Sequence, residues 1–245
     1  MLTLGQGQDV GVAPLIRMST MPTFDASRML SFDLETTSAN PLEARIVTSA
    51  LVRIDGREVT ATEHLADPGV EIPEQAAAIH GISTEKARAE GRPHNEVLKE
   101  TVDTIKQAWD DGFTLIVFNA PYDLTVLRAL TGDFTVTGPV FDPLLIDRAM
   151  DRYRKGGKRN LGALSEHYGV QLENAHEATS DAMAAARIAW KQVNSVWPEL
   201  AQKDLDELME FQAVKHFEIQ TDFRKYMESR GRDTSGINTA WPMIS

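Results

Sequence analysis

The stretch MLSFDLETTSANPLEARIVTSALVRI, residues 29–54, decides the fold. Its first part, residues 29–34, is a short apolar run that indicates a buried strand and ends at the polar turn of residues 35–38. Residues 44–54 are rich in β-branched side chains, which is typical of a second strand paired with the first. The folded part of the chain is therefore expected to begin with neighbouring strands.

Further strands and helices follow along the chain. Residues 57–65 fit a third strand, the apolar run 114–118 fits a central strand covered on both faces, and residues 140–141 fit a last short strand. Helical spacing indicates helices at 74–80, 84–89, 95–109, from 119 onward, 143–153, 160–168, 179–196 (with Thr179 or Ser180 as its cap) and 199–228. Strands that come first and later alternate with helices indicate an α/β or α+β domain around a mixed sheet.

Proline and glycine positions divide the chain into three parts. We expect a loose N-terminal tail at residues 1–25, one domain at 26–197, and a C-terminal helix and tail at 198–245, with Pro198 near the boundary. The length of 245 residues suits a domain of about 150–200 residues with an appendage.

Composition limits the classes of function. Lys and Arg number 25 and Asp and Glu number 36, so the formal charge is −11, which argues against a protein that coats DNA through phosphate contacts alone. The same charge suits an enzyme that holds an acidic substrate through divalent metals, because the metals invert the local field. Cysteine is absent, which excludes disulfides and cysteine-ligated zinc and fits the cytoplasm. We also expect no membrane span, because no apolar run reaches about 18 residues, and no signal peptide, because residues 1–21 contain no coherent apolar segment before a small-residue cleavage site.

Four carboxylates stand at the ends of predicted elements. Asp33 and Glu35 are two apart on a strand and therefore point to the same face. Asp123 and Asp181 each stand in the first turn of a predicted helix, where the helix dipole stabilises a carboxylate. His176 lies five residues before Asp181, in the loop that leads into its helix. Any of these acids taken alone could be an ordinary surface or first-turn residue.

Together these five side chains form a coherent chemical set. Hard oxygen ligands suit Mg²⁺ or Mn²⁺. Two such ions about 3.5–4 Å apart can activate a water and stabilise the leaving oxygen of a phosphoryl displacement. A histidine can take the proton of that water near neutral pH.

Three separated motifs resemble those of the DEDDh 3′→5′ exonucleases, a family that includes the proofreading (epsilon) subunit of bacterial DNA polymerase III. Residues 32–37 (FDLETT) resemble its first motif, residues 119–123 (NAPYD) its second, and residues 176–181 (HEATSD) its third, His-x-Ala-x-x-Asp. The order and wide spacing also match, and the resemblance extends over about residues 29–195. Ser38 stands where the family often has glycine, beyond the ligands, and affects only the local turn.

The resemblance implies a ribonuclease H-like fold, a five-stranded mixed sheet flanked by helices, here with a C-terminal helical appendage. It implies that two divalent ions, Mg²⁺ or Mn²⁺, are held by Asp33, Glu35, Asp123 and Asp181, and that His176 is the general base. The expected activity is 3′→5′ hydrolysis of terminal phosphodiesters in single-stranded or frayed DNA, with release of nucleoside 5′-monophosphates.

Further residues are expected to contact the substrate by the same resemblance: Thr36, Thr37, Ile79, His80 and Asn119. Residues 79–82 (IHGI) resemble a family segment that leans on the terminal nucleotide. A purely structural role stays open for His80 and for the two threonines, and Asn119 could equally be a helix cap.

A basic segment interrupts the acidic chain. Residues 148–159 contain six cations, Arg148, Arg152, Arg154, Lys155, Lys158 and Arg159. We expect Lys155 and Lys158 to grip phosphates of the incoming strand, with a solvated loop as the alternative.

Two alternatives to DNA hydrolysis remain open from the residues. An exoribonuclease that trims RNA 3′ ends would share the motifs, and a non-catalytic nucleic-acid-binding scaffold would share the fold. The clustered acids argue against a scaffold, because like charges are costly to keep together. A polymerase is one expected partner, and residues 212–217 (QAVKHF) loosely resemble sliding-clamp-binding peptides. The oligomeric state is left undetermined.

Overall fold

The computed structural model describes residues 22–154, 157–172 and 175–244. Most of the expected N-terminal tail, residues 1–21, therefore lies outside the described residues. Of the described helices, none is both long and apolar enough to cross a bilayer.

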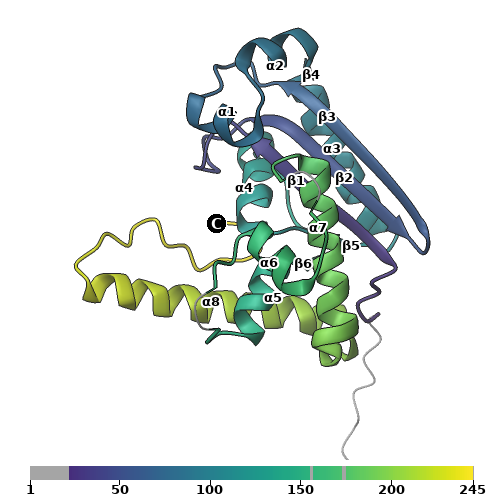
Figure 1. The fold of residues 1–245 in the computed structure, drawn as a ribbon, viewed down its shortest axis with the longest axis vertical. Coiled ribbons are helices and arrows are strands. Elements are labelled where there is room, and N and C mark those ends of the chain that lie inside the picture. The colour runs from purple at the N-terminus through teal and green to yellow at the C-terminus, as the bar shows by residue number, and fades with distance from the viewer. Residues whose placement is uncertain (1–21, 155–156, 173–174, 245) are drawn as a thin grey trace, which may run out of the picture.

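A mixed sheet forms the centre of the molecule (Figure 1). Its strands are β1 (Arg28–Thr36), β2 (Ile46–Asp55), β3 (Glu58–Asp67), β4 (Arg92–Pro93), β5 (Thr114–Ile116) and β6 (Val140–Phe141), in the spatial order β4-β3-β2-β1-β5-β6. The first three strands pair antiparallel, whereas β4, β5 and β6 each run parallel to their neighbour. The fold is the ribonuclease H-like mixed sheet with helices that the family resemblance implies.

The sheet has six strands in place of the five expected. All five predicted strands are present, and the additional one is β4, which pairs with Ala66 and Asp67 at the end of β3. Two residues carry no periodicity, and one of them is Pro93, which cannot donate to a ladder and is confined to sheet edges. The sequence pattern therefore could not reveal this strand.

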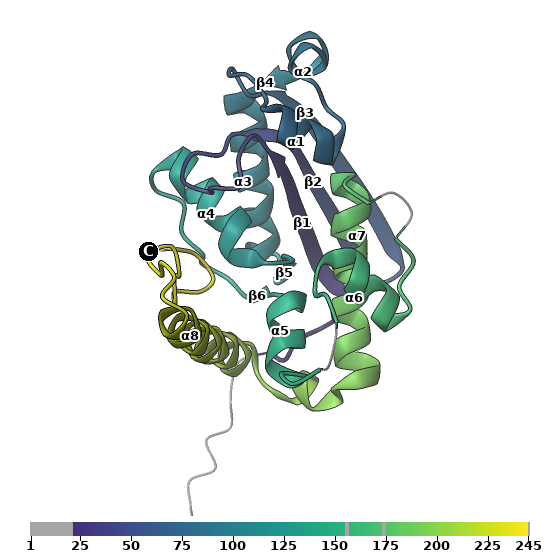
Figure 2. The ribbon, with the colours of Figure 1, turned by 60° about the vertical axis from the view of Figure 1, so that its left-hand side comes forward.

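Helices cover both faces of the sheet and its β6 edge. They are α1 (Glu74–His80), α2 (Thr84–Glu90), α3 (His94–Asp110), α4 (Ala120–Thr131), α5 (Pro143–Met150), α6 (Leu161–Tyr168), α7 (Ala178–Lys191) and α8 (Leu205–Ser229). Helices α3 and α4 lie on one face and α7 on the other (Figure 2). Helix α8 contacts α5 and β6 at the edge of the sheet.

The alternation of side chains along β1 separates the core from the site. Leu30, Phe32 and Leu34 belong to the apolar cluster that includes α3 and α4. The intervening positions face α7, since the Ser31 hydroxyl donates to the Ala182 carbonyl oxygen at 2.6 Å. The period of two therefore places Asp33 and Glu35 on the α7 side of β1.

Several predicted helix ends are wrong by a few residues. Helix α5 stops at Met150 and not at 153, and α7 begins at Ala178 with Glu177 in the N-cap position in place of Thr179 or Ser180. Its C-terminal end continues as a π-helical turn, Gln192–Val196. The single helix expected at 199–228 is a 3₁₀ turn, Pro198–Gln202, followed by α8, which Asp204 caps.

A buried glutamine joins helix α8 to the edge of the sheet by hydrogen bonds. The Gln212 side chain accepts from the Asp142 N–H at 2.8 Å and donates to the Val140 carbonyl oxygen at 2.8 Å. His216, one turn further, is also buried. The segment that resembles a clamp-binding peptide is thus helical and presents its glutamine to β6.

Candidate active site

The first two carboxylates stand where β1 extends past its neighbour β5. Strand β5 pairs only with Met29, Leu30 and Ser31, so the following residues of β1 have no ladder partner on that side. Asp33 and Glu35 occupy this free end, and both side chains are half-buried. The local fold therefore presents both acids at the edge of an unfilled space.

Asp123 reaches the same place from α4. Helix α4 follows β5 directly, and Asp123 in its first turn is buried. One carboxylate oxygen accepts the Leu34 N–H at 3.2 Å, between the two acids of β1 in sequence. This N–H is available because β5 ends before it, so strand length determines where Asp123 docks.

The start of α4 is held by Asp142, the residue after β6. The Asp142 carboxylate accepts the N–H groups of Asn119 and Ala120 at 3.1 and 3.0 Å. Asn119 occupies the N-cap position with φ of 67° and makes no side-chain cap. Asn119 therefore stands at the helix cap, which was the alternative for this residue, but its side chain does not cap the helix, and the residue lines the cleft described below.

Asp181 and His176 come from the opposite side, at the start of α7. The His176 N–H donates to both Asp181 carboxylate oxygens at 3.3 Å. The helix start itself is capped from β3, because the Glu63 carboxylate accepts the Thr179 N–H at 3.1 Å. A cap supplied from another strand explains why the sequence next to α7 did not identify the N-cap.

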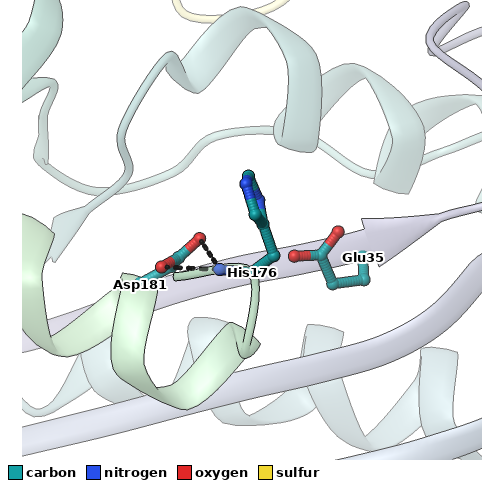
Figure 3. A group of neighbouring side chains, drawn as sticks. All are labelled: Glu35, His176 and Asp181. Carbon is teal, nitrogen blue, oxygen red and sulfur yellow. Dashed lines mark hydrogen bonds between the residues drawn. The ribbon is translucent and has the colours of Figure 1, made fainter. Parts of the chain in front are cut away.

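Figure 3 shows His176 between Glu35 of β1 and Asp181 of α7. One potential ligand atom from each of the three lies within 4.8 Å of the other two. His176 is exposed and has a left-handed backbone, with φ of 69°. Residues far apart in the chain thus converge as the motifs predicted.

The electrostatics of the cluster are those of crowded, buried acids. Burial raises the pKa of Asp33 well above its ordinary value, and the charges of Asp123, Glu35, Asp181 and Glu63 raise it further. Burial and the charges of Asp181 and Glu63 raise the pKa of Glu35 to about 7. Burial also raises the pKa of Asp123 and of Asp181, opposed in each case by a backbone N–H donor.

These shifts fit a site built for cations. Four carboxylates held close together repel one another, and cations would relieve this repulsion. The donors are hard oxygens with one adjacent imidazole, a set that suits Mg²⁺ or Mn²⁺.

A cleft of about 520 Å³ opens over the carboxylates and is called the catalytic cleft below. Its polar lining consists of Asp33, Glu35, Asn119, Tyr122, Asp123, Arg148, Arg159, Asn160 and Asp181. Acids thus stand on one part of the lining and two arginines on another.

A second cleft of about 510 Å³, called the α1 cleft, adjoins the first. Leu34, Glu35 and Tyr122 line both. The α1 cleft also contains four of the predicted substrate contacts: Thr36, Thr37, Ile79 and His80.

The predicted contacts in the α1 cleft differ in what their side chains do. Ile79 is exposed, whereas His80 is half-buried and accepts the Ile82 N–H at its Nδ1 atom, 3.2 Å away. The hydroxyl of Thr37 accepts the Arg45 N–H at 3.0 Å, and that of Thr36 bonds with Tyr122. Both threonines are buried, so their hydroxyls stabilise the turn after β1 while the pair lines the cleft.

The basic segment is only partly free for a substrate. Lys155 lies outside the described residues, and Lys158 is exposed and lines neither cleft. Arg154 and Arg159 both form ion pairs with the fully buried Asp147. The arginines of this segment were noted in the sequence, but Arg148 and Arg159 were not singled out as site residues.

The exonuclease family model RNase_T matches residues 30–189, which is more than half of the chain. The chain belongs to the RNase_T exonuclease family. Within it, the motifs identify a DEDDh-type 3′→5′ exonuclease domain.

Curated relatives of this exonuclease domain are parts of much longer proteins. The chain is 24% identical over 236 residues to a DNA polymerase III PolC-type protein of Clostridium perfringens, covering 95% of the chain and 16% of the relative. It is 33% identical over 177 residues to a DNA polymerase III subunit epsilon-like protein of Rhodobacter capsulatus, covering 66% of the chain and 23% of the relative. The chain spans less than a quarter of either relative.

The fold of the exonuclease domain also occurs in exonuclease I. The zinc-bound complex of Escherichia coli exonuclease I with single-stranded DNA superposes with a TM-score of 0.58 at 22% identity. The match covers 72% of this chain and 42% of that one.

The structure adds three residues to the exonuclease site that sequence reasoning did not select. Tyr122 lines both clefts, the charge of Glu63 raises the pKa of Asp33 and of Glu35, and Arg148 lines the wall of the catalytic cleft. Glu63 pairs with Ala50, which pairs with Asp33, so the three stand in one row across the sheet. That row depends on strand register, which the sequence pattern alone does not give.

Proposed function

We propose that this chain removes nucleotides from the 3′ end of DNA by hydrolysis of the terminal phosphodiester and releases nucleoside 5′-monophosphates. The observation that carries the proposal is that Asp33, Glu35, Asp123 and Asp181 line one cleft and that His176 lies close to Glu35 and Asp181. Membership of the exonuclease family supports the reaction class. The names of the curated relatives, both DNA polymerase III proteins, favour DNA as the substrate.

The four carboxylates would hold two divalent ions, Mg²⁺ or Mn²⁺. When bound, such ions activate a water and stabilise the charge that develops on the phosphate and the leaving oxygen. The chain's own acids supply the ligands, and the Leu34 N–H and the His176 N–H orient Asp123 and Asp181.

His176 would act as the general base. It is exposed, and one of its ring nitrogens lies near the oxygens of Glu35 and Asp181, a position that suits a base for a water bound beside these carboxylates. It can take the proton of that water at an imidazole nitrogen and return it to solvent.

The α1 cleft would receive the terminal nucleoside. Ile79 offers an exposed apolar surface for a base, and the turn that carries Thr36 and Thr37, next to Glu35, would contact the sugar. His80 in the α1 cleft and Asn119 in the catalytic cleft would make further contacts with the terminal nucleotide. Lys155 and Lys158 would attract the strand as it approaches.

Digestion of end-labelled oligonucleotides tests the proposal. The full chain is incubated with 3′- and 5′-labelled DNA, with Mg²⁺, Mn²⁺ or a chelator, and Asp33→Ala serves as the control. We expect 5′-labelled DNA to shorten stepwise, mononucleotides to be released from the 3′ label, and both to stop in chelator and in Asp33→Ala.

Matched RNA oligonucleotides separate the substrate classes. Faster hydrolysis of RNA than of DNA would move the assignment to an exoribonuclease. No hydrolysis of either substrate by the wild-type chain would leave a nucleic-acid-binding scaffold and would contradict the proposal.

A further inference from the structure

Three arginines converge on a cavity beside the catalytic cleft. It has a volume of about 280 Å³ and is lined by Arg148, Arg152, Arg159 and Ile219. We call it the arginine pocket. Arg148 and Arg159 also line the catalytic cleft, so the two spaces share a wall. Ile219 belongs to α8, which makes the C-terminal helix part of this pocket.

Two of the three guanidinium groups are held by acids. Arg159 pairs with the buried Asp147, and Arg152 pairs with Asp222 of α8. The first pair joins Arg159 to α5, and the second joins Arg152 to α8. Two of the three arginines are therefore paired within the chain, Arg159 with a buried acid and Arg152 with an exposed one.

Arg148 differs from both. Its side chain is half-buried, yet it makes no hydrogen bond or ion pair with any described residue. The nearest acid in electrostatic terms is Asp142. That carboxylate is already taken up by backbone N–H groups, those of Asn119, Ala120, Leu144 and Leu145.

A half-buried guanidinium with unused donors favours an anion. Arginine carries five N–H donors in a planar fork that matches the oxygens of phosphate. In a chain of charge −11, this convergence of arginines beside a cluster of acids is a local reversal of sign. A phosphate held there would bond Arg148 without having to displace an existing partner.

The proposal rests on the proposed function and deepens it. We infer that the arginine pocket binds a non-scissile phosphodiester of the DNA strand, on the side away from the released nucleotide, with Arg148 as the residue that contacts it. The assignment follows from the wall that the catalytic cleft and the arginine pocket share. A strand whose 3′ end lies at the carboxylates must continue from the catalytic cleft into a neighbouring space. Phosphate contacts of this kind position a strand without reading its sequence.

Steady-state kinetics test the role of Arg148. Arg148→Gln should raise KM for single-stranded DNA about 10- to 100-fold, since it removes a charged hydrogen bond. It should leave kcat within about threefold, because the contact is the same in the ground and transition states. Arg57→Gln is the matched control: it removes the same charge from an exposed turn between β2 and β3 and should not change KM.

Neutral linkages in the substrate locate the contact. A series of oligonucleotides is prepared, and each carries one methylphosphonate at a different linkage near the 3′ end. In the wild-type chain one non-scissile position should raise KM, and the same position should have no further effect in Arg148→Gln. Arg57→Gln should keep the wild-type interference pattern.

Several results would overturn the inference while leaving the proposed function intact. One is an Arg148→Gln variant that keeps the wild-type KM and the wild-type pattern of interference by methylphosphonate linkages. Another is a lowered melting temperature with unchanged KM, which would make Arg148 a structural counter-ion of Asp142 and Asp147. A third is loss of inhibition by a nucleoside 5′-monophosphate without any effect on strand interference, which would assign the pocket to the product. Failure of the wild-type chain to hydrolyse any oligonucleotide would instead contradict the proposed function itself.

Discussion

At the scale of the residue, the site consists of like charges that the fold forces together. Burial raises the pKa of Asp33, and the charges of Asp123, Glu35 and Asp181 raise it further. Such an arrangement costs free energy unless cations or protons neutralise it. The sequence identified these four acids because strand periodicity and helix starts place side chains without long-range information. It could not identify Glu63, whose place depends on register.

His176 is the residue whose removal should affect chemistry more than cation binding. His176→Ala should lower kcat by about 10²–10⁴-fold, because a positioned general base contributes about that much. Its effect on Mn²⁺ affinity should be small, since the four carboxylates remain. His167→Ala, an exposed histidine on α6 outside both clefts, is the control. A loss of less than about tenfold would assign proton transfer to another group.

Glu35 should make the metal-free protein less stable as the pH rises. Its pKa is about 7 in the folded chain against 4.5 for the ordinary group. Between these values the folded state binds more protons than the unfolded state, so stability falls as the pH rises through this window. Glu35→Gln removes the effect, and its advantage in free energy of unfolding over wild type should grow from pH 4.5 to about 7 and then level off.

Urea unfolding in the presence of a chelator measures this difference at a series of pH values. Glu58→Gln is the control, because it changes an exposed acid at the first residue of β3. Its difference from wild type in free energy of unfolding should not grow with pH. An advantage of Glu35→Gln that is constant over the whole range would show that the cluster does not raise this pKa.

At the scale of the element, the helices α4 and α7 each carry an acid of the site, and a side chain from another part of the chain holds the start of each helix. Helix α4 is held by Asp142 and α7 by Glu63, both through backbone N–H groups at the helix start. The sequence predicted that these helices exist and which acids they carry. It placed the α7 cap wrongly because the cap comes from β3, and a local pattern contains no information about distant acceptors.

The segment between α5 and α6 depends on one buried acid. Asp147 is fully buried and accepts from Arg154, Arg159 and the Tyr168 hydroxyl, the last at 2.6 Å. Asp147→Ala leaves two partly buried arginines without their counter-charge, so it should destabilise the chain by about 3–5 kcal/mol in urea unfolding.

A surface pair gives the matched control for this prediction. Asp103→Ala removes the exposed i,i+4 partner of Lys99 and should cost less than about 1 kcal/mol. Equal costs for the two substitutions would mean that Asp147 is not the anchor of the segment.

At the scale of the whole molecule, the C-terminal helix is connected to the acids that line the catalytic cleft. Gln212 of α8 bonds to the backbone of Asp142, and the Asp142 carboxylate holds the start of α4, which carries Asp123. Helix α8 also forms a wall of the arginine pocket through Ile219. The appendage predicted from the sequence is therefore in physical contact with the site, a relation that amphipathic spacing alone did not reveal.

Direct measurement of Mn²⁺ binding tests the central claim, that five distant side chains form one centre for a pair of divalent ions. Titration of the full chain with Mn²⁺, followed by electron paramagnetic resonance of the free ion, should show two bound ions per chain. Asp33→Asn and Asp181→Asn should each lose a bound ion or weaken binding by more than about tenfold, equal to about 1.4 kcal/mol. A wild-type chain that binds no Mn²⁺, or variants that bind it as the wild type does, would contradict the account.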